Sequence, residues 1–350
     1  MLAFALLLFV ALEAALQIRS HIRYGQSIFN VLTAETRYVI DVRTGLKVLR
    51  PDHVFRSKQI EVRTNSHGLR SPPISPIKAP PTYRIAVVGA STVMGAFAAS
   101  NEATFSYRLA KLLNDAEHET GKRYEVINAG IAGYGLAEQA QMIEKMILPL
   151  DPDLIIVYPG FNDFGGYCQA DGGGALRPQP RRQPLYQLET PSWLLTVDLI
   201  RKNTVSLRSP PANTAEFRSP RELDLAPYRT RLDNLIGTVK DAGLPLLLAT
   251  NARAYRPSQP IEKQLLLSET ARFYNPCFDL AGLHDLYDLH NAEITDAAAN
   301  HGTFLIPLGE LIPGGREYFV DASHFSARGE ETAAHHLHQF LVRNVLSQNH

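Results

Sequence analysis

Two short segments, far apart in the chain, carry residue types that can perform acyl transfer together. Ser91 follows directly after an apolar run at 84–90, and Asp321 and His324 lie three residues apart near the other end of the sequence. A serine hydroxyl is a weak nucleophile at neutral pH, so it needs a histidine within about 3 Å to accept its proton and a third group to orient the imidazole. These three residues therefore predict a nucleophile, a base and an orienting carboxylate.

The elements that must position these residues follow an alternating pattern. Short apolar runs, bounded by turn formers and continuous as in strands covered on both faces, lie at 84–89, 124–128, 153–158, 244–250 and 303–308. Helical spacing of apolar residues or helix-like sequence follows at 105–116, 140–147, 228–241, 261–274, 283–300 and 327–346. The alternation predicts an α/β fold with a mostly parallel sheet and helices on both faces.

Polar or glycine-bearing turns follow three of the predicted strands. They span residues 89–92, 128–135 and 160–163, and they contain Ser91, Gly133 and Asn162 respectively. In an open parallel sheet, functional groups gather outside the carboxyl ends of the strands. We therefore expect these three turns to lie along one edge of the sheet.

The chain resembles the SGNH, or GDSL-type, hydrolase superfamily over about residues 83–346. That family carries Ser, Gly, Asn and His in four ordered blocks, and Ser91, Gly133, Asn162 and His324 match them in order and in strand context. The first block of the family usually reads Gly-Asp-Ser, whereas Ala90 stands in place of the aspartate here, which puts details of that block in doubt. The resemblance implies a three-layer α/β/α fold with a flavodoxin-like parallel sheet and a serine hydrolase acting on ester bonds.

This resemblance assigns a role to each matched residue. Ser91 would attack an acyl carbonyl, His324 would take its proton and return it to the leaving alcohol, and Asp321 would hold the imidazole. The backbone N–H groups of Ser91 and Gly133 and the side-chain amide of Asn162 would form the oxyanion hole. This mechanism requires no organic cofactor and no metal.

Each of these residues also has a purely structural interpretation. Ser91 could cap the following helix, Gly133 could serve a tight turn, and Asn162 could be a turn residue. His324 could be an ordinary hydrogen-bonded histidine. Four such coincidences in the correct order are improbable, which favours the functional interpretation. Three further histidines, at 335, 336 and 338, show no clear spacing for a metal site.

Substrate and partners are less well specified than the chemistry. We expect an acyl, above all acetyl, ester on cell-envelope or exopolysaccharide carbohydrate. The same site could instead run an O-acyltransferase, since only the acceptor differs, and a non-catalytic carbohydrate-binding or scaffold protein is a third hypothesis. Oligomeric state cannot be read from the sequence.

Composition limits the classes of protein to which the chain can belong. The chain has 350 residues, is 45% hydrophobic, and carries 35 basic and 35 acidic residues, so its net charge is +0. The length and apolar content are sufficient for a large buried core, and the charge balance provides no global basic field for nucleic acid. Only two cysteines occur, Cys168 and Cys277, which could form one disulfide bond or remain two separate thiols.

The N-terminal part predicts a separate organisation. Residues 2–16 are apolar except for Glu13, and we interpret residues 1–23 as a membrane anchor or signal-like helix, with a cleaved signal or an interfacial helix as alternatives. Residues 24–82 form an extension that ends in a stretch with five prolines between 71 and 82. The catalytic domain would span 83–350, with an insertion at about 165–221 that is rich in Gly, Pro and Arg.

Two observations bear on localisation. Arg19 and Arg23 follow the apolar run, and the positive-inside rule would put that side in the cytoplasm. The extension, however, contains Asn65-Ser66-His67-Gly68-Leu69-Arg70. This stretch is similar to an Asn-x-x-Gly-x-Arg sequence before the catalytic domain of membrane-anchored members found with bacterial exopolysaccharide machinery. On this resemblance we expect a membrane-anchored, periplasmic or extracytoplasmic protein, with the orientation left open.

Overall fold

The computed structural model describes residues 2–24, 37–57, 59–116, 122–168, 194–197, 199 and 217–349. The chain divides into two compact units. One contains residues 1–37, 55–59 and 176–216, and the other contains 38–54, 60–175 and 217–350. Most of the predicted insertion at 165–221 lies outside the described residues, and the predicted domain boundaries stay predictions.

The first unit contains helix α1 (Leu2–Tyr24). The carboxylate of Glu13 accepts the backbone N–H groups of Leu195 at 3.1 Å and Thr196 at 2.7 Å. The one acidic residue of the apolar run thus has hydrogen-bond donors within its own unit. Across the described residues, no helix combines the length and the apolar character needed to cross a bilayer.

The second unit is built on a five-stranded parallel sheet with the order β6-β5-β7-β8-β9. Its strands are β5 (Thr82–Gly89), β6 (Arg123–Gly130), β7 (Leu154–Tyr158), β8 (Leu246–Ala249) and β9 (Phe304–Ile306). This is the flavodoxin-like order. The chain first adds β6 on one side of β5 and then adds β7, β8 and β9 in turn on the other side, so the strand order changes direction between β5 and β7. The α/β fold and the five strands predicted from the sequence are confirmed.

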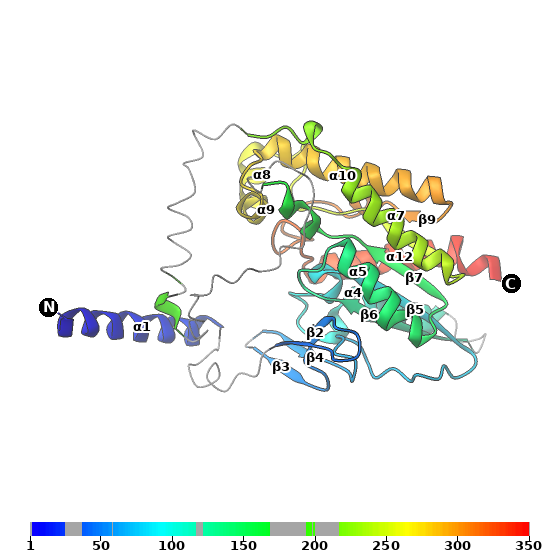
Figure 1. Ribbon diagram of the computed structural model, residues 1–350, viewed down its shortest axis with the longest axis horizontal. Coiled ribbons are helices and arrows are strands. Elements are labelled where there is room, and N and C mark those ends of the chain that lie inside the picture. Colours follow the sequence, from blue (N-terminus) through cyan, green and yellow to red (C-terminus); the bar gives the residue numbers. More distant parts are fainter. Residues whose placement is uncertain are drawn as a thin grey trace. The chain divides into compact units, whose positions relative to one another are not determined.

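Helices cover both faces of this sheet (Figure 1). The helices described in this unit are α3 (Ser91–Met94), α4 (Phe105–Ala116), α5 (Leu136–Met142), α7 (Ala226–Asp241), α8 (Ile261–Leu267), α9 (Glu269–Tyr274), α10 (Leu280–His301), α11 (Leu308–Leu311) and α12 (Ala327–Asn344). A π-helical turn, η2 (Ile143–Ile147), extends α5. The 3-10 turns are η1 (Asn101–Ala103), η3 (Leu148–Leu150), η4 (Phe161–Gly166), η5 (Pro220–Glu222) and η6 (Leu346–Asn349).

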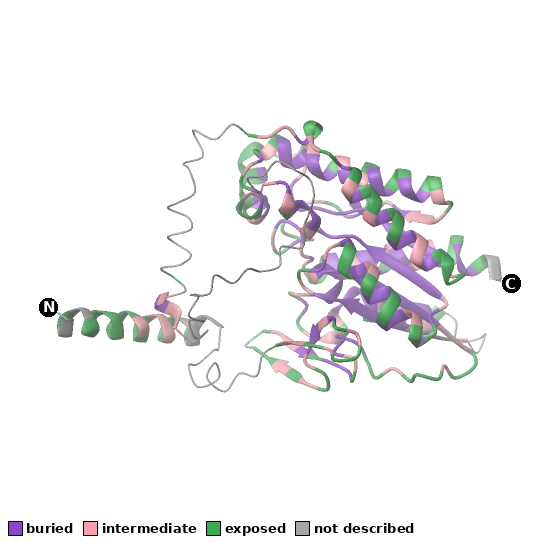
Figure 2. Cartoon of the chain, in the orientation of Figure 1, coloured by how far each residue is buried: buried purple, intermediate pink, exposed green. Residues whose placement is uncertain are grey.

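Successive side chains along each strand point to opposite faces of the sheet, and this divides the core into two layers. In β5, Ile85 and Val87 pack with α4 and α12 on one face, while Ala86 and Val88 pack with α5 and α7 on the other. All four side chains are fully buried, and each such burial stabilises the fold by roughly 1.5–3 kcal/mol for a residue of Val or Ile size. Figure 2 shows the sheet mostly buried, with exposed positions on the outer sides of the helices.

Four short strands precede the sheet. They are β1 (Tyr38–Ile40), β2 (Lys47–Leu49), β3 (Val54–Arg56) and β4 (Glu61–Arg63). Strands β1 and β2 pair in antiparallel fashion. The side chains of Leu46, Val48 and Leu69 belong to the same buried cluster as Ala86 and Val88 of β5. Residues around β2 therefore pack directly on the sheet that carries the candidate site.

Candidate active site

Ser91 is placed by the carboxyl end of β5. The strand ends at Gly89, and Ser91 is the first residue of the short helix α3. Its Oγ lies 2.7 Å from Nε2 of His324. The alternative that Ser91 caps this helix is wrong, because Ala90 occupies the N-cap position and no side-chain cap bond is made there.

His324 and Asp321 lie in the loop before α12. Nδ1 of His324 is 2.7 Å from Oδ2 of Asp321, and Oδ1 accepts the backbone N–H groups of Ser323 at 3.0 Å and His324 at 2.9 Å. Burial by itself would raise the pKa of Asp321, but the hydrogen bond and charge interaction with His324, together with these N–H groups, hold that pKa below its ordinary value. Asp321 is therefore an anionic acceptor, and its position in a hydrogen-bonded chain with His324 and Ser91 is that of an orienting carboxylate.

The glycine turn and the asparagine come together at the ends of β6 and β7. Gly133 has a φ of +85°, a left-handed conformation that residues with side chains rarely adopt. Asn162 donates a hydrogen bond from Nδ2 to the backbone oxygen of Tyr134 at 3.0 Å. Because an amide nitrogen carries two hydrogens, one can hold this turn while the other serves a ligand.

Asp163 braces the same region from inside the fold. Its Oδ1 accepts the backbone N–H of Leu136, the first residue of α5, at 3.2 Å. Burial raises the pKa of Asp163 to about 7, although the hydrogen bond from Leu136 and the charge of Arg231 act in the opposite direction. Asp163 thus ties η4, which carries Asn162, to the helix that follows the turn of Gly133.

A cavity of about 500 Å³ opens beside these groups. Ser91, Gly133, Asn162 and His324 all line it, so the hydroxyl, the imidazole and the predicted oxyanion donors face one space. Its volume is in the usual range for small-molecule sites. Aromatic side chains form part of the lining, namely Tyr158, Phe161 and Tyr274. The structure therefore brings all five predicted site residues together, while their catalytic roles stay predictions.

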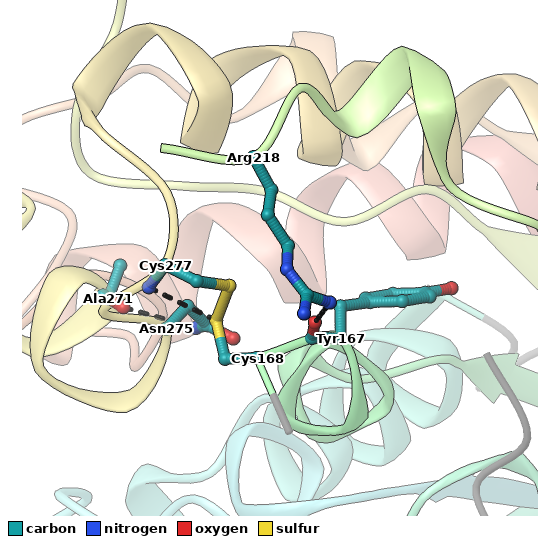
Figure 3. The surroundings of a disulfide bond; sticks show 6 residues. All are labelled: Tyr167, Cys168, Arg218, Ala271, Asn275 and Cys277. Atoms are coloured by element: carbon teal, nitrogen blue, oxygen red, sulfur yellow. Dashed lines mark hydrogen bonds between the residues drawn. A yellow bond between two sulfur atoms is a disulfide. The ribbon is translucent and has the colours of Figure 1, made fainter. Parts of the chain in front are cut away.

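A disulfide bond links two elements that line this cavity. Cys168 and Cys277 are bonded, with their Cα atoms 5.3 Å apart, so of the two possibilities left open by the sequence the bridge is present (Figure 3). It joins the segment after η4 to the segment after α9. Phe161 of η4 and Tyr274 of α9 stand with their ring centroids 6.3 Å apart. The bridge therefore holds these two aromatic elements near each other.

The Asn-x-x-Gly-x-Arg stretch is an ordered turn. Oδ1 of Asn65 accepts the backbone N–H groups of His67 at 3.0 Å and Leu69 at 3.1 Å. Gly68 has a φ of +69°, and a Cβ at this position would lie 2.2 Å from the backbone oxygen of Leu49. The asparagine and the glycine are therefore both required by the turn that leads into Arg70.

Arg70 connects this turn to the nucleophile helix. Its side chain is buried, and Nη1 donates to the backbone oxygens of Met94 at 3.3 Å and Gly95 at 2.5 Å, at the end of α3. Nη2 donates to the backbone oxygens of Glu61 and Ala98, each at 3.0 Å. The planar fork of a guanidinium suits such multiple acceptors. A residue of the N-terminal extension thus fastens the helix that begins with Ser91.

In the described part of the chain, no group of three or more His, Cys, Asp or Glu side chains is arranged to hold a metal ion. This includes the three histidines on α12, His335, His336 and His338.

Several residues at or behind the site have no signature in the sequence. The ring of Phe97 meets the imidazole of His324 edge-on, with centroids 5.2 Å apart. Lys47 of β2 donates from Nζ to the backbone oxygen of Ala132 at 2.8 Å. Tyr274 is brought to the cavity by α9. None of these residues lies in a motif or next to one, so only the tertiary structure places them.

Comparisons with known proteins give low similarity. No family model matches the chain, and no curated protein matches it in sequence. An α/β hydrolase from the metagenome of Lake Arreo, Spain, is 14% identical, with 76% of this chain and 96% of that chain covered and a TM-score of 0.45. A lipase/acylhydrolase from Enterococcus faecalis is 17% identical over 74% of this chain and 95% of that chain, with a TM-score of 0.43.

A third similar structure is a variant of an acetyl xylan esterase from Geobacillus stearothermophilus. It is 13% identical, with 76% of this chain and 96% of that chain covered and a TM-score of 0.45. These similarities are too weak to assign an activity to this chain. The chemistry must be inferred from the site itself.

Proposed function

We propose that the chain is a serine esterase that hydrolyses an acyl ester by way of an acyl-enzyme on Ser91. The observation that carries this proposal is the pair of 2.7 Å contacts that join Ser91 Oγ to His324 Nε2 and His324 Nδ1 to Asp321 Oδ2. A serine, a histidine and a carboxylate connected in this order are the arrangement that activates a hydroxyl for attack on a carbonyl.

The reaction would proceed in two halves. In the first, Oγ of Ser91 bonds to the acyl carbon while Nε2 of His324 takes the hydroxyl proton and then passes it to the leaving alcohol. In the second, water attacks the acyl carbon and gives a proton to Nε2 of His324, which passes it to Oγ of Ser91 as the bond between Oγ and the acyl carbon breaks and the acid is released. The N–H groups of Ser91 and Gly133 and the amide of Asn162 would stabilise the oxyanion in both halves.

An acetyl or other short acyl ester on a carbohydrate of the cell envelope or an exopolysaccharide is the substrate class we favour. The cavity is lined by both polar groups and aromatic rings. Tyr274 keeps 60% of its surface exposed, so its ring can offer a face to a sugar at the cavity. The similarity of the Asn65 to Arg70 stretch to membrane-anchored members adds support for an envelope substrate.

Transfer of the acyl group to a sugar hydroxyl is the second candidate function. It would use the same acyl-enzyme, because only the acceptor of the second half differs. A non-catalytic scaffold is less well supported, since binding alone has no need of a histidine hydrogen-bonded to the serine hydroxyl.

The location outside the cytoplasm is part of this proposal. The disulfide bond between Cys168 and Cys277 supports it, because such bonds persist mainly in oxidising compartments. Anchoring by residues 1–23 would keep the site close to envelope polymers. Thiol labelling of the protein taken directly from exported and from cytoplasmic fractions would test the location.

The test of activity is hydrolysis of p-nitrophenyl esters of increasing chain length by the full-length protein, beside Ser91→Ala and His324→Ala. We expect turnover, fastest for short acyl groups, that falls by at least about 10⁴-fold in both variants. Turnover that appears only when an oligosaccharide acceptor is added would favour transfer. Turnover that both variants retain would contradict the proposal.

A further inference from the structure

A lysine from the N-terminal extension stands directly behind the glycine turn of the site. Lys47 lies on β2, 85 residues before the carbonyl that it binds, and its Nζ donates to the backbone oxygen of Ala132 at 2.8 Å. A Cβ added to Gly133 would lie 3.4 Å from the same Nζ. The cation therefore sits against the peptide that supplies one of the expected oxyanion donors.

Further contacts hold the ammonium group in this place. The hydroxyl of Tyr134 donates to the backbone oxygen of Lys47 at 2.5 Å. Nζ lies 5.2 Å from the ring centroid of Tyr38 and 5.6 Å from that of Tyr134, within the range of cation–π attraction. The extension and the glycine turn are thus linked in both directions, and Lys47 is half-buried between them.

The position matters because of the chemistry of the peptide group. The carbonyl of Ala132 and the N–H of Gly133 belong to one resonance-stabilised peptide unit. A cation that hydrogen-bonds the oxygen draws electron density toward it, which makes the N–H at the other end of the unit a stronger donor. The strengthened donor benefits an oxyanion more than a neutral ester carbonyl, so the effect falls on the transition state.

We infer that Lys47 is a positioning residue that polarises the Ala132–Gly133 peptide and so strengthens the oxyanion hole. This inference rests on the proposed function, since it requires an oxyanion to form at Ser91. It gives the N-terminal extension a part in the reaction that acts through the Ala132–Gly133 peptide.

The test compares Lys47→Met, which keeps an apolar side chain of similar length, with Lys47→Arg, which keeps the charge. Both are measured for kcat and KM on p-nitrophenyl acetate and for inhibition by a trifluoromethyl ketone, which forms a tetrahedral oxyanion with an active serine. Lys78→Met is the matched control, because Lys78 pairs with Asp153 at the amino end of β7, away from the site.

We expect Lys47→Met to lower kcat about tenfold with little change in KM, a split that marks loss of an interaction made in the transition state. Binding of the ketone should weaken by a similar factor. Lys47→Arg should recover most of both losses, and Lys78→Met should behave as wild type. A thermal unfolding curve of each variant separates these effects from loss of fold.

Two results would overturn the role of Lys47 while leaving the proposed function intact. One is Ser91-dependent turnover and ketone binding that Lys47→Met leaves unchanged. The other is an equal loss in Lys47→Met and Lys47→Arg that tracks lower unfolding temperatures in both, which would indicate packing only. A wild-type protein with no Ser91-dependent turnover and no ketone binding would overturn the proposed function itself.

Discussion

The two halves of the candidate site are built in different ways. In the proton-relay half, Ser91, His324 and Asp321 are hydrogen-bonded to one another, so the group is held together by its own side chains. In the oxyanion half, Gly133 and Asn162 depend on residues around them. Lys47 binds the glycine turn from behind, and Asp163 ties η4 to α5. The three relay side chains therefore bind one another directly, whereas Gly133 and Asn162 are held by residues outside the set of expected catalytic groups.

After loss of Ser91 or His324 itself, the largest expected effect comes from changing Asp321, at the far end of the relay. Asp321→Asn keeps the shape of the side chain but removes the charge and favours the wrong tautomer of His324, so we expect kcat to fall by about 10³- to 10⁴-fold. Steady-state ester hydrolysis measures this. Asp279→Asn is the control, since Asp279 caps α10 through the N–H of Gly282 and asparagine can do the same. A loss below tenfold in Asp321→Asn would mean that the relay is not in use.

The oxyanion half should show a smaller loss. We expect Asn162→Ala to reduce kcat by about 100- to 1000-fold with a modest change in KM, which is the usual cost of one oxyanion donor. The same assay applies, and Asn344→Ala on the outer side of α12 serves as control. If kcat stays unchanged while KM rises, Asn162 contributes to substrate binding and the division of the site into two halves needs revision.

The contacts of Arg70 with α3 should contribute to the free energy of unfolding rather than to the rate of the reaction. Arg70→Met removes the guanidinium donor from the buried backbone oxygens of Met94 and Ala98, each at a cost of about 1–3 kcal/mol, so the free energy of unfolding should fall by several kcal/mol. Urea denaturation measures this change. Arg63→Met, which removes a mostly exposed ion-pairing arginine, should cost less than about 1 kcal/mol. Equal effects of the two substitutions would argue against Arg70 as an anchor of α3.

The last expected effect depends on pH and concerns a buried carboxyl group behind that helix. Oε2 of Glu330 accepts the N–H of Phe105 at 2.7 Å, and burial raises the pKa of Glu330 to about 8, against that hydrogen bond and the charges of Arg70 and Arg108. Between its ordinary pKa of 4.5 and about 8, the folded protein keeps the proton that the unfolded chain loses. Its stability therefore falls as pH rises through this window.

Glu330→Gln should remove this dependence. Relative to wild type, the variant should gain roughly 1.4 kcal/mol in the free energy of unfolding for each pH unit between those limits. Urea midpoints at pH 5, 6.5 and 8 give the comparison. Parallel curves for the two proteins would show that Glu330 titrates normally.

The residues of the relay half could be predicted from the sequence, whereas those that build and hold the oxyanion half could be predicted only in part. Ser91, His324 and Asp321 lie in short local motifs next to predictable strands and helices, because continuous apolar runs reveal buried parallel strands. Ser268 shows the limit of this approach, since it separates α8 from α9 where the pattern predicts one helix. Lys47 could not be predicted, because its role depends on a contact with Ala132 that only the packing of the extension creates.

The most direct measurement is the site of covalent modification by a serine-directed fluorophosphonate. The full-length protein is labelled, digested and mapped by mass spectrometry, beside Ser91→Ala and His324→Ala. The account predicts one adduct, on Ser91, that is absent in the first variant and forms far more slowly in the second. An unlabelled Ser91 in folded protein, or labelling at the same rate without His324, would contradict the claim that Ser91 is a histidine-activated nucleophile.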